Sequence, residues 1–389
     1  MRIFYASDHT PNASMPSSRL WYYNLYLPLV DLGHDVVLFQ YNLTPHFCNL
    51  DPADPRQKAF IEENRPKLEQ ALLKQIKEAH RQKPIDLFFS YFYSACCRPE
   101  IIREIRSMGI MTINWYCNAS YQFHLISEIA PAYDYCLVPE KFRLDDYRRI
   151  GANPIYCQEA ANPNIYKPYS VPQEYDVTFV GQRYGDRPEY VRYLLDKGID
   201  VRVWGLGWCS KPVGIFSKND IFLWRKLAKL RTLYGWKMAA HKLYQSVSKH
   251  LGRQHNDPQI PSEICGPPLS DEDLIKMYSR SRISVGFSSC GETHRSGKRI
   301  LQVRLRDFEA PMSGAFYMVE YIKELEELFE VGKEIVCYYD KADLVEKIRY
   351  YLSHDNEREE IRRAGYLRAK NDHSWQKRFT DIFKQVGLV

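Results

Sequence analysis

Basic side chains gather near a glutamate in the segment "SSCGETHRSGKRILQVRLRDFEAPMSGAF", residues 288–316. Guanidinium and ammonium groups can hold a diphosphate, a carboxylate can accept hydrogen bonds from both ribose hydroxyls, and a small-residue turn can present backbone N–H groups. We therefore expect this segment to bind a nucleotide-diphosphate sugar; an amphipathic helix with a buried capping glutamate is the alternative. The residues expected to bind this donor are Lys298, Arg304, Arg306, Phe308, Glu309, Ser313 and Gly314.

A second candidate phosphate loop is "GQRYGDR", residues 181–187, which follows a predicted strand. Gly181 allows close backbone approach, and Arg183 and Arg187 could hold phosphate. A helix is expected to begin at Pro188, where free N–H groups and the positive end of the helix dipole favour anions. An ordinary surface turn is the alternative interpretation of this loop.

Two runs of alternating strands and helices position these loops. Six apolar strands are expected in residues 1–160, and five more in residues 175–370, where the alternation restarts. Residues 161–174 are a proline-containing linker, and residues 371–389 form a helix expected to cross back to the N-terminal domain. Continuous apolar strands separated by helices are typical of parallel sheets covered on both faces. The fold class is therefore α/β, with two Rossmann-like parallel-sheet domains facing a central cleft.

Three local patterns give sharper structural expectations. The charged helical region from about 56 to 82 is predicted to be interrupted near Pro66, and another helix is predicted near 300–310. Ser270, followed by Asp273 and an apolar run, is typical of a helix N-cap with a capping-box-like partner. We therefore do not interpret this acidic stretch as a metal motif, and we expect neither a bound metal nor a cofactor.

The composition indicates a globular intracellular protein. Hydrophobic residues make up 45% of the 389 residues, and the net charge is only +6. The N-terminus enters a strand at once, with no signal-like segment, and no apolar run approaches the roughly 20 residues needed to span a bilayer. The ten cysteines lack metal-ligand spacing, so we expect reduced thiols and a cytoplasmic location.

Three stretches together resemble one known family. "RLRDFEAPMSGAF", "VTFVGQRYGDRPEYVRYLLDKGIDVRVWGLGW" and "PPLSDEDLIKMYSRSRISVGFSS" are similar to the CgeB-type (spore-maturation) glycosyltransferase-like proteins. These are related to the family 4 glycosyltransferases of the GT-B fold, and the resemblance covers residues 175–380 apart from a basic insertion. It implies a donor-binding C-terminal domain and an acceptor-binding N-terminal domain. It also implies that Glu309 binds the donor ribose and that the turn at Ser313 and Gly314 meets the phosphates.

The function implied is transfer of a sugar from a nucleotide-diphosphate donor to a glycan, lipid-linked or protein acceptor, without a metal. In this fold the leaving diphosphate can be stabilised by basic groups and backbone dipoles. An inverting enzyme also needs a base near the acceptor. The first-domain loops offer Asp8, His9 and His124 as catalytic candidates, although a lone histidine is more often structural.

The basic insertion, residues 211–256, holds ten lysines or arginines against one acid. Its apolar residues recur at helical spacing, which predicts a hairpin that is apolar on one side and basic on the other. We expect Arg225, Lys226 and Lys229 to contact either an acceptor or an anionic membrane at the inner membrane surface. A hairpin packed on its own domain, with its charges in water, is the alternative.

Two other functions stay open. A GT-B epimerase would act on the nucleotide sugar itself and need no acceptor. A degenerate GT-B module would bind sugar or a partner without catalysis, and Asn118 and Gln302, which stand where relatives carry acids, keep this reading open. Nucleic acid is not an expected partner, because no base-reading or stacking pattern accompanies the basic residues.

Overall fold

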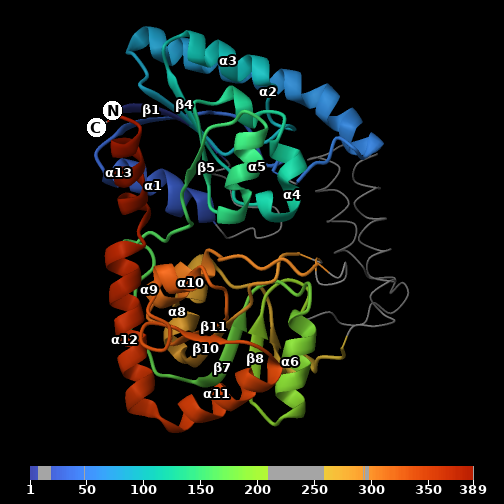
Figure 1. Ribbon diagram of the computed structural model, residues 1–389, viewed down its shortest axis with the longest axis vertical. Helices are drawn as coiled ribbons and strands as arrows, with labels where there is room; N and C mark the ends of the chain where they lie inside the picture. Colours follow the sequence, from blue (N-terminus) through green and yellow to red (C-terminus); the bar gives the residue numbers. More distant parts are fainter. Residues whose placement is uncertain (8–18, 48, 209–257, 292, 294–297, 389) are drawn as a thin grey trace, which may run out of the picture.

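The computed structural model describes residues 1–7, 19–47, 49–208, 258–291, 293 and 298–388 (Figure 1). It contains two six-stranded sheets, one built from the first part of the chain and one from the second. All strand pairs in both sheets are parallel. The predicted α/β class with two parallel-sheet domains is therefore confirmed.

The first sheet has the order β2-β1-β3-β4-β5-β6. All four residues of its central strand β3 are buried, which explains why its strands appear in the sequence as continuous apolar runs. All six strands expected from the sequence are present. They are β1 (Arg2–Ala6), β2 (Asp35–Leu38), β3 (Leu87–Ser90), β4 (Met111–Trp115), β5 (Tyr135–Val138) and β6 (Pro154–Tyr156).

The second sheet has the order β12-β11-β10-β7-β8-β9. The strand order reverses between β7 and β10, which is where open α/β sheets bind their ligands. Strand β9 was missed in the sequence because it has only two residues. The strands are β7 (Tyr175–Val180), β8 (Val201–Trp204), β9 (Cys265–Gly266), β10 (Ser281–Gly286), β11 (Tyr317–Glu320) and β12 (Val336–Tyr338).

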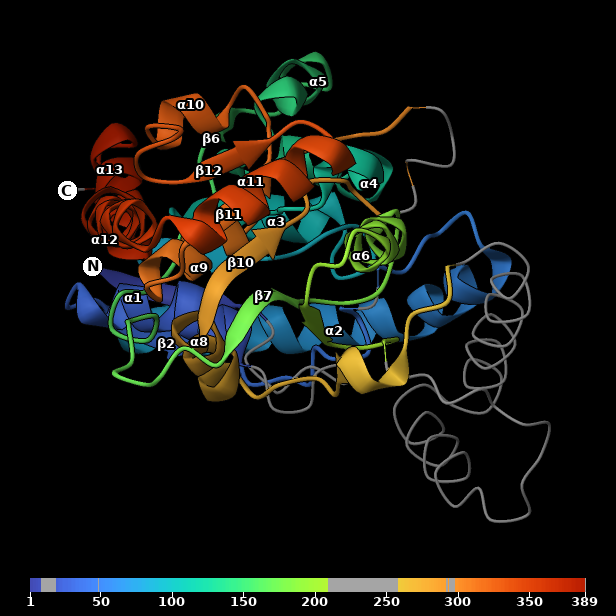
Figure 2. The ribbon, with the colours of Figure 1, turned by 90° about the horizontal axis from the view of Figure 1, so that it is seen from below.

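Helices cover both sheets. In the second domain, α6 and α11 share one hydrophobic core cluster, and α8 and α9 contribute to another. Figure 2 shows α11 and α8 on opposite sides of β7 and β10. The helices are η1 (Tyr22–Tyr26, a π-helix), α1 (Leu27–Asp31), α2 (Pro55–Gln82), α3 (Pro99–Ser107), α4 (Ala119–Ile126), η2 (Ala130–Ala132), η3 (Lys141–Arg143), α5 (Leu144–Arg149), α6 (Arg187–Asp196), η4 (Ser262–Ile264), α8 (Asp271–Arg280), α9 (Arg306–Met312), α10 (Leu325–Leu328), α11 (Lys341–Ser353), α12 (Asp355–Asp372) and α13 (Trp375–Gln385).

Two helix predictions were wrong. Helix α2 continues through Pro66, because this residue is exposed, water can reach the carbonyl it frees, and buried residues on both sides hold the helix. Helix α9 begins only at Arg306, not near 300. The preceding residues pair with the loop after β10 instead: the N–H of Cys290 donates to Ile300 (2.8 Å) and that of Gln302 to Ser288 (3.1 Å).

The N-cap prediction for α8 was correct. The Oγ of Ser270 accepts a hydrogen bond from the N–H of Asp273 at 3.1 Å. Among the helices of the described residues, none is both long and apolar enough to cross a membrane. The basic insertion at 211–256 lies outside the described residues, as do Arg225, Lys226 and Lys229 within it.

The chain crosses between the domains twice, at 157–174 and again between α12 and α13. The two crossings pair through a parallel bridge, in which the N–H of Ala161 donates to His373 (3.1 Å) and that of Trp375 donates to Ala161 (3.2 Å). Helix α13 then joins the core of the first domain, where Trp375 packs edge-on against Trp115. Both chain ends therefore lie beside the first domain (Figure 1).

Candidate functional site

The carboxyl ends of the two sheets face each other where the domains meet. Tyr121, at the start of α4 after β4, lies within 3.7 Å of where a Cβ on Gly291 would be, in the loop after β10. On another part of the interface, the Tyr156 hydroxyl and the Gln158 amide both donate to Glu324, beyond the end of β11 (2.6 and 2.9 Å). Loops at this edge are the usual ligand-binding loops of such sheets.

Two arginines of the second domain lie at this edge without a carboxylate partner. Arg187, the first residue of α6, donates to the Gln182 carbonyl (2.9 Å) and to the Tyr184 hydroxyl (2.7 Å), and its guanidinium stacks over the Tyr184 ring. Arg304 donates to the Ser289 carbonyl at 2.6 Å. The Nε atom of each arginine is buried and has no hydrogen-bond partner. Neither arginine forms an ion pair within the part of the chain that the structure describes.

Electrostatics show that these cations act on each other. Burial lowers the pKa of Arg187 to about 10, and the charges of Arg304 and Arg306 contribute to this shift against the opposing effects of Tyr184 and Asp186. Like charges held together in a partly dry site are unfavourable unless an anion neutralises them. A bound anion would relieve this repulsion at Arg187.

The neighbouring Arg299, by contrast, is fully paired. It forms ion pairs with Asp186, at the end of the 181–187 loop, and with Glu320, at the end of β11. Arg299 thereby ties these two loops together, and its charge is already neutralised.

The other predicted donor-binding cations lie in different surroundings. Arg183 donates to the Pro258 carbonyl (2.9 Å) and lies over Trp208. Lys298 is exposed. Arg306 donates to the Tyr278 hydroxyl (2.8 Å) and lies 3.9 Å from a Glu309 oxygen. The structure thus brings Arg187, Arg304 and Arg306 together and places Arg183 on the β8 side; the roles of all four stay predictions.

Glu309 is buried on α9, only 3% exposed. Burial raises the pKa of its carboxyl, against the opposing effects of the Arg306 charge and of the Tyr166 and Asn24 side chains beside it. Its Oε1 atom is buried and has no hydrogen-bond partner. Because Asn24 belongs to the first domain and Tyr166 to the linker, Glu309 faces the domain interface and retains one free acceptor there.

The expected contact of the Ser313–Gly314 turn with the phosphates stays a prediction, and the structure gives the turn other partners. Its N–H groups already donate to carbonyls of α9, from Ser313 to Glu309 (2.9 Å) and from Gly314 to Pro311 (2.8 Å). The turn precedes β11, so it lies at the amino end of that strand, at the opposite edge from the phosphate loops. Helix α9 runs antiparallel to the strands, so only its beginning can face the ligand edge.

Phe308 is fully buried on α9. It packs against the rings of Phe329 and His373, in the core of the second domain. Any effect of Phe308 on binding therefore acts through the position of α9. Gly181 directly follows β7. Its carbonyl accepts a hydrogen bond from Trp208 (2.7 Å), and a Cβ at this position would collide with Phe179.

The predicted catalytic residues are only partly placed. Asp8 and His9 lie outside the described residues. The His124 side chain, on α4, is 56% exposed, and its Nε2 lies 3.3 Å from an oxygen of Asp51. His124 is thus a surface residue of the first domain, three positions after the interface residue Tyr121.

Two buried glutamates of the first domain were missed in the sequence. Glu140 follows β5 and Glu159 follows β6, and they are 2% and 6% exposed. Burial raises their pKa values to about 7 and about 8. Glu140 accepts the Ser120 N–H (3.2 Å) at the start of α4. The rule that ligand-binding residues follow strand ends would have found both, had it been applied to the segments after β5 and β6 as well as to the other first-domain loops.

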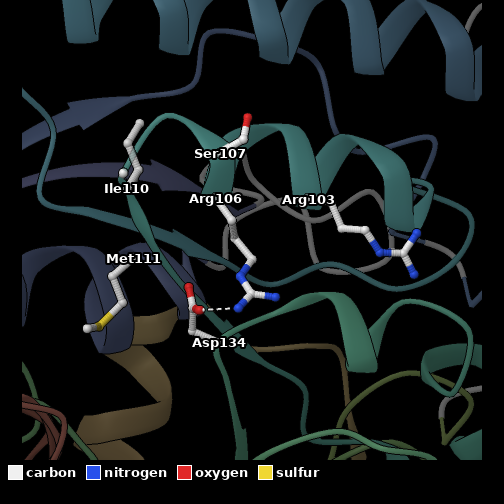
Figure 3. A pocket seen from close by; sticks show the side chains of 7 residues that line it. Arg103, Arg106, Ser107, Ile110, Met111 and Asp134 are labelled. Atoms are coloured by element: carbon white, nitrogen blue, oxygen red, sulfur yellow. Dashed lines mark ion pairs between the residues drawn. The ribbon is translucent and has the colours of Figure 1, made fainter.

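An open hollow of about 550 Å³ lies elsewhere on the first domain (Figure 3). It lies at the start of β4, at the edge of the first sheet opposite the domain interface. Its cations are already paired, Arg106 with Asp134 at 2.7 Å and Arg103 with Glu100 at 3.4 Å. Within the described ranges, no three His, Cys, Asp or Glu side chains are grouped so that they could hold a metal ion.

Solved structures share this architecture over the whole chain. Sucrose-phosphate synthase from Thermosynechococcus elongatus aligns with a TM-score of 0.61 and 14% identity, covering 100% of this chain and 99% of that one. Anabaena HepE in complex with UDP-glucose aligns with a TM-score of 0.55 and 12% identity, covering 100% and 99%. Trehalose 6-phosphate synthase from Burkholderia multivorans gives 0.55 and 12%, covering 100% and 96%. These likenesses confirm the predicted GT-B fold.

The family is shown by the sequence itself. No curated protein matches the chain. Residues 187–384, just over half of it, match the model of a family described as glycosyl transferase-like. This region contains α6, the loop with Arg304 and all of α9. The enzyme class predicted from the sequence is therefore confirmed, and the chain belongs to the glycosyl transferase-like family.

Proposed function

We propose that the enzyme transfers a sugar from a nucleotide-diphosphate donor, and that Arg187 and Arg304 hold the diphosphate. The observation that carries this proposal is the pair of guanidiniums at the switch point of the second sheet, each with a buried, unpartnered Nε and no carboxylate partner among the described residues. Guanidinium groups bind phosphate oxygens through short, charge-assisted hydrogen bonds.

The comparisons support a nucleotide-sugar donor. HepE shares the fold and was solved with UDP and with UDP-glucose. The finer parts of the proposal are membership of the CgeB-type group and a glycan, lipid-linked or protein acceptor. The three sequence stretches quoted above support membership of the CgeB-type group. A separate first domain that faces the proposed donor site supports the binding of an acceptor.

The chemistry asks mainly for charge stabilisation. The acceptor oxygen forms a bond to the anomeric carbon as the bond from that carbon to the diphosphate breaks. The acceptor's proton passes to a base, and the electron pair leaves with the diphosphate. Arg187 and Arg304 stabilise the developing charge in a site that excludes much of the water, where such interactions are stronger than in bulk solution. In this proposal no metal ion is required for that step.

Glu309 would bind the donor ribose. Its unpartnered Oε1 faces the domain interface beside Arg306, so it can accept a hydrogen bond from a ligand hydroxyl. A ribose at Glu309 and a diphosphate at Arg304 are compatible with one nucleotide, because α9 and the loop before it carry both groups only five residues apart.

The test is nucleotide-sugar binding by calorimetry, with UDP-glucose, GDP-mannose, ADP-glucose and dTDP-glucose as the panel. We expect at least one member to bind, and Arg304→Ala to weaken it by at least tenfold, since a hydrogen bond to a charged group contributes about 1.5–3 kcal/mol. Arg192→Ala is the matched control, because Arg192 lies on α6 with Arg187 but pairs with Asp196 on the surface. Equal affinity in the Arg304 variant and the control would contradict the proposal.

A further inference from the structure

Glu159 is a buried carboxyl that the fold does not explain. It stands three residues after the end of β6, in the first domain, where the chain begins its crossing to the second. It is 6% exposed, and its Oε2 atom is buried with no hydrogen-bond partner. No hydrogen bond from any described residue reaches its carboxyl group. Glu140, the neighbouring buried glutamate, differs because it accepts the N–H of Ser120.

The surroundings of Glu159 are drawn from both domains. From the second domain, Arg304 favours its ionised form, while Glu309 and Asp307 on α9 oppose it. From the first domain, Glu140 opposes ionisation too, and the Tyr91 hydroxyl and the Cys117 thiol lie within electrostatic range. Among these neighbours, the charge of Arg304 lowers the pKa of Glu159, and the three carboxyls raise it.

The protonation state of Glu159 follows from this environment. Burial, with the three neighbouring carboxyls, raises its pKa to about 8 in spite of Arg304. At pH 7 the group is therefore mostly the neutral carboxylic acid. A neutral carboxyl has one O–H donor, which here has no acceptor among the described residues.

We propose that Glu159 enters the donor site as the neutral acid and donates a hydrogen bond to the diphosphate held by Arg304. This inference rests on the proposed function. An ionised carboxylate beside a diphosphate would repel it, whereas a carboxylic acid forms a short hydrogen bond to a phosphate oxygen. The first domain then contributes directly to donor binding. The proton on Glu159 removes its negative charge and provides the hydrogen-bond donor, so neither a metal nor a further cation is needed at this position.

The proposal couples donor binding to a proton. Only the protonated form of Glu159 binds, so the affinity is fully present below pH 8 and is lost as the pH rises through about 8. Between pH 8 and 9 it should fall about five- to sixfold, and at higher pH the slope approaches a factor of ten per pH unit. Binding at pH 8 should take up about half a proton, and binding at pH 6.5 almost none.

The experiment is calorimetric titration of the full chain with UDP-glucose, or with whichever panel member binds, at pH 6.5, 8 and 9. These sugar nucleotides are diphosphate diesters, whose phosphates do not titrate in this range. Two buffers of different ionisation enthalpy give the number of protons taken up. The variants are Glu159→Gln, Glu159→Ala and the control Glu330→Gln, a surface residue that pairs with Lys333.

Glu159→Gln should bind as wild type does at pH 7, because its amide also donates a hydrogen bond. It should lose the pH dependence and bind about tenfold more tightly than wild type at pH 9. Glu159→Ala should bind at least tenfold more weakly at pH 7. Glu330→Gln should match wild type in affinity and in proton uptake.

A melting curve checks that the Glu159→Gln variant folds. The raised pKa means that the ionised form is penalised in the folded protein, so Glu159 costs stability above its ordinary pKa and the cost grows until about pH 8. The variant, which cannot ionise, should therefore melt at a higher temperature than wild type at pH 8. A lower melting temperature would overturn the assignment of a neutral acid.

Two binding results separate this inference from the proposed function. If wild type binds with no proton uptake, or if Glu159→Gln keeps the pH dependence, the role of Glu159 is wrong, while the diphosphate site at Arg304 stands. If no panel member binds wild type at any pH, both are wrong.

Discussion

At the scale of single residues, the charged side chains of the interface fall into two groups. Arg299 with Asp186 and Glu320 is a closed set of ion pairs, which holds loops together. Arg304 and Glu309 each have a buried polar atom without a partner. An unsatisfied buried polar group costs about 1–3 kcal/mol, so such groups persist where a ligand completes them. Arg304 also forms no ion pair with any described residue, and for this reason we assign the diphosphate to it.

The residue-scale prediction concerns Glu309. We expect Glu309→Ala to weaken binding of the donor about 10- to 150-fold, because it removes a charged hydrogen bond of about 1.5–3 kcal/mol to the ribose. Calorimetry with the bound panel member measures this. Glu330→Ala, which changes an exposed glutamate of the same domain, is the control, and an unchanged affinity in the Glu309 variant would remove the ribose assignment.

At the scale of elements, α9 decides which residues can meet a ligand. Its beginning carries Arg306 at the interface, and its end carries the Ser313–Gly314 turn, against the linker. Gly314 has a φ of +77°, and a Cβ there would come within 2.9 Å of two carbons of Pro168. The turn thus needs glycine for its conformation and for close packing, and we expect this need, not contact with phosphate, to explain the glycine.

Gly314→Ala tests this distinction. We expect a lower midpoint of thermal unfolding, because alanine is strained at positive φ and its Cβ would press on Pro168. The loss should exceed that of Gly332→Ala, which has a φ of +87° but no atom within 4 Å of the added carbon. The donor affinity of the folded variant should stay unchanged. A loss of affinity without a loss of folding would indicate that the turn contacts the phosphates.

At the scale of the whole molecule, the proposed donor site draws its residues from both domains. Arg304 and Glu309 come from the second domain and Glu159 from the first, and the paired crossings at Ala161 and Ser374 keep the two together. All charges proposed to face the diphosphate belong to the chain itself. The whole molecule would thus supply what a divalent cation supplies in other enzymes.

Chelation tests that proposal. Donor affinity and the acceptor-dependent release of nucleoside diphosphate should be the same in excess EDTA as with added Mg²⁺, because guanidinium groups carry the charge of the leaving diphosphate. If EDTA abolished turnover and Mg²⁺ or Mn²⁺ restored it, the assignment of that charge to the arginines would be wrong.

The sequence by itself determined the features that depend on near neighbours along the chain. Apolar strand runs and helix periods predicted the two parallel sheets, and Ser270 with Asp273 predicted the start of α8. The predicted interruption of α2 at Pro66 was wrong, because local propensity does not show which face of a helix is exposed to water. The family motif also directed attention to the loop that carries Arg304.

The tertiary structure alone decided which charges are paired. Arg299 and Arg304 look equivalent in sequence, yet one has two carboxylate partners from distant loops and the other has none among the described residues. Glu159 stands far along the chain from Arg304 and α9, and only the meeting of the two sheets brings them together. Burial and pairing depend on contacts between residues far apart in the chain, which local patterns of residue type do not specify.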